Sequence, residues 1–233
     1  MARAARPTAA DEAGTGPATA PATAGSTGAS PGASTGGRRA QGASTKAAIL
    51  DAAIDLYAER GFRGTGLMAI GERAGVAHAT VLYHFGSSHD LLVAVLAERE
   101  RRFQEATRDD WIEPGLGSLR HLPDVARFHV AEPKLGKLFA VLQAENLDPD
   151  HEANAFFRQR RREIHALLQA QLERAIDLGE IRPDVDCSRK ADEILAFTTG
   201  AQIQYFLAPD EVDLVALYEG YTSALIADLV ADG

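Results

Sequence analysis

The chain has 233 residues, of which 45% are hydrophobic and 24% are charged, enough for one or two folded domains with a sizeable core. Its single cysteine, Cys187, excludes an internal disulfide and a cysteine-based zinc site, and it fits a reducing compartment such as the cytoplasm. The sequence contains no run of about 18 apolar residues, so no membrane span is expected. The N-terminal sequence also has no apolar stretch typical of a secretory signal.

The net charge of −9 argues at first against a nucleic-acid partner, but the charge is unevenly distributed. Residues 44–103 hold seven basic and seven acidic residues, whereas residues 104–233 hold 13 basic and 24 acidic residues. The excess acid therefore belongs to the C-terminal part, and the neutral segment before it can still make local phosphate contacts.

Residues 1–43 consist almost wholly of Ala, Thr, Gly, Pro and Ser, and they contain no Val, Ile, Leu, Phe, Tyr or Trp. Such a segment cannot bury enough apolar surface to offset the entropy lost on ordering, so we predict a disordered arm. Arg38 and Arg39, just before the first predicted helix, allow two interpretations. They form an arm that reaches into a DNA minor groove, or they belong to a solvated linker, which is the commoner case.

The segment from Thr45 to Arg60 has the apolar spacing of an amphipathic helix. Ser44 or Thr45 is a suitable N-cap, and Gly61 is a suitable residue to end the helix. The apolar stripe consists of Ile49, Ala53, Leu56 and Tyr57.

Two short helices are predicted next, one from Thr65 or Gly66 to Gly75 and one from about Ala77 to His84. Gly75 lies where a sharp turn needs a positive φ, which glycine adopts at little cost. Small or hydrogen-bonding side chains on the second of these helices face outward. This is the pattern of a helix-turn-helix whose outer face suits a DNA major groove.

A fourth helix is predicted to begin at Ser87 or Ser88 and to lead into the charged run 98–102. The remaining sequence is also helical in pattern, with prolines between the segments. Long helices are predicted at about 152–179, 188–207 and 211–232, the first with Phe156, Ile164, Leu167, Leu168, Leu172 and Ile176 facing inward. The fold class is therefore all-α, with domains at residues 44–103 and 104–233 after the arm.

The segment from Thr45 to Phe103 resembles the TetR (TetR/AcrR) family of transcriptional regulators. The motifs that carry the resemblance are ILDAA at 49–53, ERGF at 59–62, Thr65, IGERAGV at 70–76, Thr80, LYHF at 82–85 and Leu91–Leu92. The chain departs from the usual pattern at Gly71, where the family often has Ala, at the start of the recognition helix, and after Ser87, where the family's lysine is absent.

The resemblance implies that the recognition helix enters the major groove. Thr80 and His78 would then lie at or near the bases. Phosphate contacts would come from Tyr83 and His84, from Lys46 at the start of the first helix and from Thr65 near the start of the second. Tyr83 has the alternative of packing its ring in the core, and His78 that of simple solvent exposure. The full set of predicted DNA-binding residues is Lys46, Thr65, Ala77, His78, Ala79, Thr80, Tyr83, His84 and Ser88.

Enzyme and metal functions are not indicated. We find no nucleophile–base pair, no phosphate-binding glycine loop and no metal-ligand spacing, and His78 and His84 do not share a helical face. We therefore expect no catalytic residues, no cofactor and no metal. The run Arg160–Arg162 is interpreted as a solvated face or a row of ion pairs.

The C-terminal domain is where the resemblance places a small-molecule effector and the contacts of a homodimer. Aromatic residues could line an apolar cavity, although such residues more often form plain core. The candidate residues are Trp111, Phe128, Phe139, Leu142, Phe156, Phe157, Phe197, Gln202 and Tyr205, with Gln143 and Gln204 as further polar groups. The last two long helices carry enough apolar surface to pack on a second copy.

These observations predict a sequence-specific DNA-binding regulator in the cytoplasm, a repressor released from a palindromic double-stranded operator by an unknown effector. The alternative is an effector-independent DNA-binding interaction protein or an activator. The two differ in whether a small molecule stabilises the folded protein.

Overall fold

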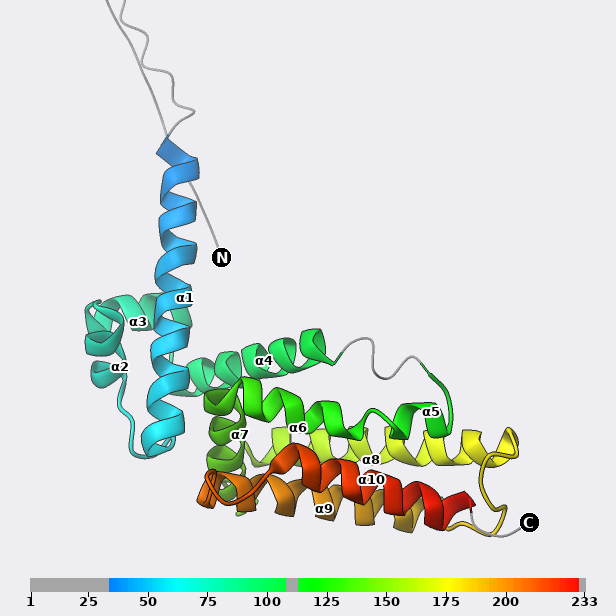
Figure 1. Cartoon of the computed structure of the whole chain (residues 1–233). Helices are drawn as coiled ribbons and strands as arrows, with labels where there is room; N and C mark the ends of the chain where they lie inside the picture. Colours follow the sequence, from blue (N-terminus) through cyan, green and yellow to red (C-terminus); the bar gives the residue numbers. More distant parts are fainter. Residues whose placement is uncertain (1–33, 108–112, 231–233) are drawn as a thin grey trace, which may run out of the picture. The chain divides into compact units, whose positions relative to one another are not determined.

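The computed structural model describes residues 34–107 and 113–230. The chain divides into two units between Arg39 and Ala40, and, apart from the first residues of α1, the features discussed below belong to the second unit. All regular elements in the described ranges are helices, which confirms the predicted all-α class (Figure 1). They are α1 (Ser34–Arg60), α2 (Leu67–Ala74), α3 (His78–Phe85), α4 (Ser88–Ala106), α5 (Leu116–Leu119), α6 (Leu122–Ala131), α7 (Pro133–Glu145), α8 (Asn154–Asp177), α9 (Cys187–Leu207) and α10 (Leu214–Val230).

Helix α1 begins earlier than predicted. The sequence placed its start at Thr45, but the helix begins at Ser34, so residues 34–43 of the predicted arm are helical. The Thr45 hydroxyl does not cap a helix end, because it donates to the Gln41 carbonyl at 2.9 Å, a bond typical of threonine inside a helix. The rest of the predicted arm, including the predicted disorder of residues 1–33, lies outside the described residues.

Helices α1 to α4 share one hydrophobic core. Ile49, Tyr57, Ile70, Val81 and Leu92 are completely buried in it. The core also includes residues from later in the chain: Phe128, Leu135, Leu138, Leu142, Ala153 and Phe157. The packing of the N-terminal helices therefore extends to α6, α7 and the start of α8.

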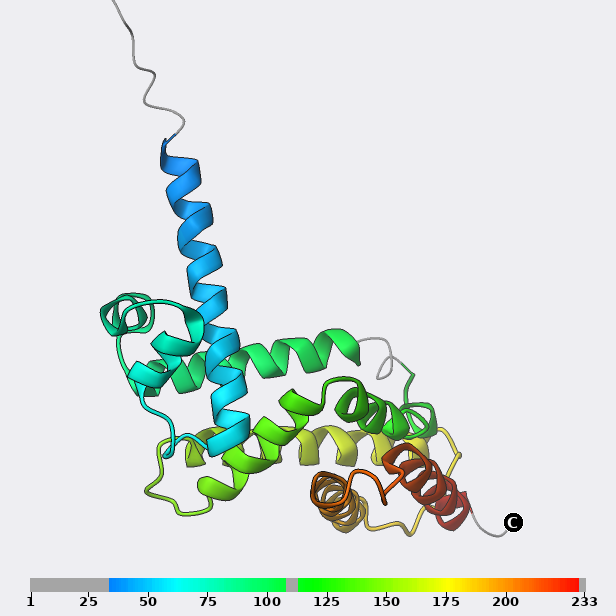
Figure 2. The same cartoon turned by 60° about the vertical axis from the view of Figure 1, so that its left-hand side comes forward.

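A second core joins α5, α6, α8, α9 and α10. Figure 1 shows α9 running beside α8 and α10, and Figure 2 shows α9 and α10 next to each other from a second direction. Leu168, Leu172, Ile194 and Tyr218 are almost fully buried there. Leu167, predicted to face inward, is 40% exposed. The aromatic pair Phe197 and Tyr221 stacks α9 on α10 with 3.6 Å between ring centroids.

Helix α4 is continuous across residues 103 and 104, where the sequence suggested a domain boundary. It carries core residues of the N-terminal helices in its first half and, at its end, the segment that leads to the C-terminal helices. The domain limits at 44–103 and 104–233 stay a prediction. Within the described ranges, no helix has the length and apolarity needed to cross a membrane.

Candidate functional site

The turn between α2 and α3 is built as the sequence predicted. Gly75 has φ 70°, in the left-handed region that glycine adopts without a Cβ penalty. The amide of Gly75 donates to the Glu72 carbonyl at 3.2 Å and the amide of Val76 donates to the Gly71 carbonyl at 2.9 Å. This pair of bonds is a Schellman end, which stops α2 sharply and sets the direction in which α3 begins.

Helix α3 presents a polar and small-residue face to solvent. Val81 and Phe85 anchor its inner side in the core. Ala77, at the N-cap, and His78 and Ala79 are exposed, while Thr80 and His84 are partly exposed. The helix therefore offers an accessible surface with close backbone approach at its N-terminal end, as a groove-reading helix requires.

Tyr83 is 85% exposed, so the alternative that its ring packs in the core is wrong. Its ring meets the His84 ring edge-on, with 5.2 Å between centroids. A large exposed aromatic residue with a hydroxyl group can contact a phosphate without any change in the core.

Lys46 and Ser88 flank this face. Lys46 is exposed, and its Nζ lies 5.4 Å from the centroid of the Phe85 ring, which joins α1 to the end of α3. The prediction that Lys46 lies at the start of the first helix is wrong, because α1 begins at Ser34. Ser88 is partly buried in the first turn of α4, and the cap of α4 is Ser87, which accepts from the Asp90 amide at 3.0 Å.

Thr65 has a structural role. It is only 6% exposed, and its hydroxyl donates to the Gly61 carbonyl at 2.7 Å. Its amide donates to the Phe62 carbonyl at 3.1 Å. Both groups bond inside the fold, so Thr65 is not among the proposed phosphate contacts.

A cavity of about 1020 Å³ lies among α4, α6, α7, α8 and α9. Of the candidate effector-site residues, Phe139, Phe157, Gln143 and Gln202 line it. Gln202 is buried and donates to the Gly136 carbonyl at 3.1 Å. The volume is that of a typical site for a small organic ligand.

The other candidate residues lie elsewhere or outside the described ranges. Leu142 is completely buried in the core, and Phe128 meets Phe103 edge-on with 5.2 Å between centroids. Trp111 lies outside the described residues. Phe156 packs against Phe157, and Tyr205 packs against Phe206. Phe197 packs against Tyr218 and Tyr221. Gln204 is exposed.

The sequence interpretation missed the charged residues of this cavity. Arg99 is 3% exposed, and the Arg160 side chain is 13% exposed. Both come from charged runs. For the run Arg160–Arg162, the alternative of a row of ion pairs is confirmed at Arg160, which pairs with Glu100, and at Arg161, which pairs with Asp192. The only sequence signal was the position of Arg99 on the same stripe as Leu92, Val95 and Leu96.

Burial shifts the ionisation of two groups in the cavity wall. It lowers the pKa of Arg99 to about 9, assisted by the neighbouring Arg160 and opposed by Glu100. Burial, followed by the charges of Arg99 and Arg160, also lowers the pKa of His129 to about 3, so this imidazole is neutral at pH 7. The two arginines therefore carry the local positive charge.

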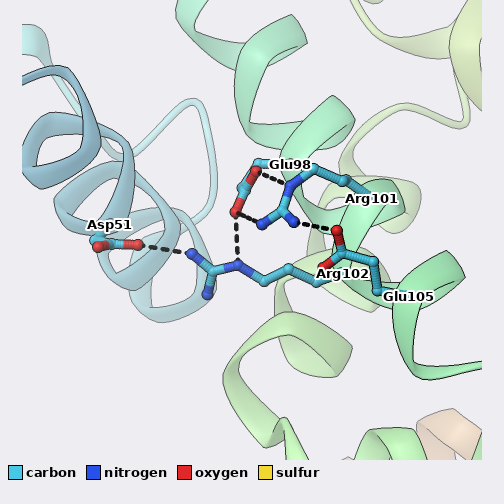
Figure 3. Close-up of polar contacts among 5 residues, drawn as sticks. All are labelled: Asp51, Glu98, Arg101, Arg102 and Glu105. Carbon is cyan, nitrogen blue, oxygen red and sulfur yellow. Dashed lines mark hydrogen bonds and ion pairs between the residues drawn. The ribbon is translucent and has the colours of Figure 1, made fainter. Parts of the chain in front are cut away.

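Next to Arg99 on α4, an ion-pair network joins this helix to α1 (Figure 3). Arg102 contacts Glu98 at 2.7 Å and Asp51 at 2.9 Å, and Arg101 contacts Glu98 at 2.7 Å and Glu105 at 2.6 Å. Hydrogen bonding from Arg101, together with Arg102, lowers the pKa of Glu98 to about 2. The network fixes the middle of α4 relative to the N-terminal helices.

A second connection joins the segment after α1 to α7. The Phe62 amide donates to the Glu145 carboxylate at 2.7 Å, and Lys134 pairs with Asp55 at 2.7 Å. His151 Nδ1 donates to the Glu145 carbonyl at 2.6 Å, which leaves its Nε2 to accept from Arg63. Because α7 also contributes Phe139 to the cavity, cavity and helix-turn-helix share their supporting elements.

The comparisons with known proteins agree with this arrangement. Residues 49–95 match the model of bacterial regulatory proteins of the tetR family, and residues 138–230 match the model of the C-terminal domain of BetI-type transcriptional repressors. The chain is 26% identical over 186 residues to the HTH-type transcriptional regulator TtgR of Pseudomonas putida, covering 76% of this chain and 87% of TtgR.

Two further matches differ in how much of the chain they cover. HTH-type transcriptional regulator RutR of Escherichia coli is 45% identical over 63 residues, which is 27% of this chain and 30% of RutR. The solved structure of the transcriptional regulator FadR from Bacillus subtilis in complex with stearoyl-CoA has the same fold, with a TM-score of 0.67 at 19% identity over 78% of this chain and 98% of FadR. The two matching family models together span more than half of the sequence, and the chain belongs to the TetR family of bacterial transcriptional regulators.

Proposed function

We propose that this regulator is a repressor that occupies a two-fold symmetric operator as a homodimer and leaves it when a small molecule binds the cavity. The observation that carries the proposal is the exposed face of α3, held at a fixed angle by the Gly75 turn. Its place of action would be the cytoplasm, where bacterial DNA lies.

The proposed DNA contacts divide into two classes. His78 and Thr80, at the N-terminal end of α3, are the proposed base-reading residues, with Ala77 and Ala79 allowing close approach. Tyr83 and His84, in the last turn of α3, and Lys46 and Ser88, near that end of the helix, would contact phosphates, which position the protein without reading sequence.

The proposed dimer surface is on α9 and α10. Ile203, Leu207 and Leu217 are 44%, 74% and 41% exposed there, and exposed apolar surface on neighbouring helices is typical of a protein–protein interface. Gly200 and Gly220 have open space where a Cβ would lie, so a second backbone can approach closely. Two copies packed through these helices would place two α3 helices for half-sites about 34–36 Å apart.

Helix α4 is the proposed route from the cavity to DNA. It carries Arg99 and Phe103 in the cavity wall, and its N-terminus follows α3 after the short turn at Gly86 and Ser87. A ligand that contacts α4 differently in two conformations of the protein shifts the equilibrium between those conformations. Only that difference in affinity can release the α2–α3 helix-turn-helix from the operator.

Selection of bound sequences from random duplex DNA, at a stated salt concentration, tests the proposal. We expect a two-fold symmetric consensus, and a His78→Ala or Thr80→Ala variant should select an altered one. Sequence-independent, salt-sensitive binding, or no binding, would contradict it.

A further inference from the structure

The charge inside the cavity is opposite in sign to that of the domain around it. Residues 104–233 hold 13 basic and 24 acidic residues, yet the cavity wall contains four arginines and two acids. Arg161 and Asp192 are half-exposed and pair with each other at 2.7 Å, and Arg158 is exposed. Of the three remaining charged groups, Arg99 is buried, and Glu100 and Arg160 are partly buried.

These three groups leave one positive charge without a full partner. Glu100 Oε2 pairs closely with Arg160, and the same oxygen is 3.4 Å from Arg99 NH1. Within the part of the chain that the structure describes, the Arg99 Nε has no hydrogen-bond partner although it is buried. One carboxylate therefore serves two guanidinium groups, an arrangement that is costly in a low-dielectric interior.

Aromatic faces hold Arg99 in place. Its guanidinium carbon lies 4.3 Å from the centroid of Phe139, 4.8 Å from that of Phe103 and 5.6 Å from that of Phe128. Arg160 lies 5.4 Å from the centroids of both Phe103 and Phe139. Such contacts offset part of the desolvation cost, but they satisfy no N–H group.

Among the described residues that line the cavity, no other buried group carries a negative charge that could pair with Arg99. His129 lines the same cavity and is neutral at pH 7 because burial depresses its pKa to about 3. The rest of the wall is largely apolar, with Val125, Ile164, Leu168 and Ile194 from α6, α8 and α9. A ligand that fits must therefore combine one negative charge with an apolar body.

We propose that the effector is a monoanionic amphiphile, an apolar molecule with a single carboxylate, whose carboxylate is bound by Arg99 and Arg160. The planar guanidinium groups match the geometry of a carboxylate, and the apolar wall takes the hydrocarbon or aryl portion. Glu100 competes with the ligand for the same two arginines. This inference rests on the proposed function only in calling the ligand an effector.

Calorimetric titration of the DNA-free protein with matched ligand pairs tests the inference. The pairs are dodecanoate with dodecan-1-ol, and 2-naphthylacetate with 2-naphthylacetamide. In at least one pair the acid should bind about 30-fold more tightly or better, which corresponds to about 2 kcal/mol. If neither acid binds more tightly than its neutral partner, the inference is wrong. Tighter binding of dodecanoyl-CoA than of dodecanoate would also overturn it, since the thioester has no carboxylate at that position.

Four variants test which residues cause the preference for the acid. Arg99→Met keeps the side-chain volume and should abolish the preference while leaving the neutral ligand within about 3-fold. Arg160→Met should also reduce it, whereas Arg162→Met, on the same helix and outside the cavity wall, should not. Glu100→Gln should strengthen acid binding, because it removes the competing carboxylate, and weaker acid binding in this variant would contradict the proposal.

Operator binding by the same preparations separates this inference from the proposed function. A protein that binds its selected operator but shows no preference for acids keeps the function and loses the inference. A protein that prefers acids but binds no specific DNA keeps the inference about the cavity and loses the repressor function.

Discussion

Phe62 and Glu145 are far apart in the sequence, and a hydrogen bond of 2.7 Å joins them, from the Phe62 amide to the Glu145 carboxylate. The bond holds the segment that follows α1 against the C-terminal end of α7. The same carboxylate leaves no room for a Cβ at Gly61, so the contact depends on a glycine there. It is a direct connection between the helices that present α3 and the helices that form the cavity.

Glu145→Ala should therefore lower the free energy of unfolding by about 1.5–3 kcal/mol, because a hydrogen bond to a charged group is lost. Hydrogen exchange at the Phe62 amide should increase, and mass spectrometry of the peptide around residue 62 measures it. Glu163→Ala, which removes an exposed acid from α8, is the control. Unchanged protection of the Phe62 amide would show that Glu145 does not hold this segment.

Gly75→Ala should destabilise the protein by roughly 1–2 kcal/mol, because an L-residue with a Cβ is strained at φ 70°. Gly75→Asn should cost less, since asparagine tolerates this region. Gly66→Ala is the matched control: its φ is −89° and a Cβ there meets no atom within 4 Å. Equal urea midpoints for the Gly75→Ala and Gly66→Ala variants would contradict the role assigned to the turn.

Lys46→Ala should weaken binding to every DNA site by a similar factor and reduce the slope of log affinity against log salt by about 1. The reason is that a phosphate contact releases a counterion without reading a base. Thr80→Ala should instead change the relative affinities of operator variants, with the salt slope retained. Fluorescence anisotropy across a salt series measures both, and a change of preference in the Lys46 variant would reverse the assignment.

The Glu98 network should make stability dependent on acid pH. Hydrogen bonds from Arg101 and Arg102 lower the Glu98 pKa from 4.5 to about 2, so the folded state favours the ionised carboxylate. The stabilisation, about 1–2 kcal/mol after allowing for solvent screening, is complete above pH 4.5 and is lost as the pH falls toward 2.

Urea unfolding of the parent protein and a Glu98→Gln variant between pH 2 and 6 measures this contribution. The difference in unfolding free energy between the two proteins should shrink as the pH falls. Glu105→Gln, which alters the exposed end of the same network, should have a much smaller effect. A difference that does not vary with pH would exclude the ionised carboxylate as its cause.

The N-terminal motif could be predicted from the sequence because its signals are local. The Gly75 turn, the apolar stripe of α1 and the exposed small residues of α3 each depend on spacing within a few residues. The start of α1 could not be predicted, because residues 34–43 have no apolar periodicity to report a helix.

The all-α class, the helix-turn-helix and the residues that α3 presents all follow from the amino-acid order, since backbone conformation and helical period depend on neighbouring residues. Which charges are buried depends instead on the three-dimensional packing. Arg99 and Arg160 each lie among other charged residues in the sequence, yet both pack against the rings of Phe103 and Phe139. A charge is buried by the helices that pack around it. Here the packing brings together residues of α4, α7 and α8 that are far apart in the sequence, so no local sequence pattern could predict it.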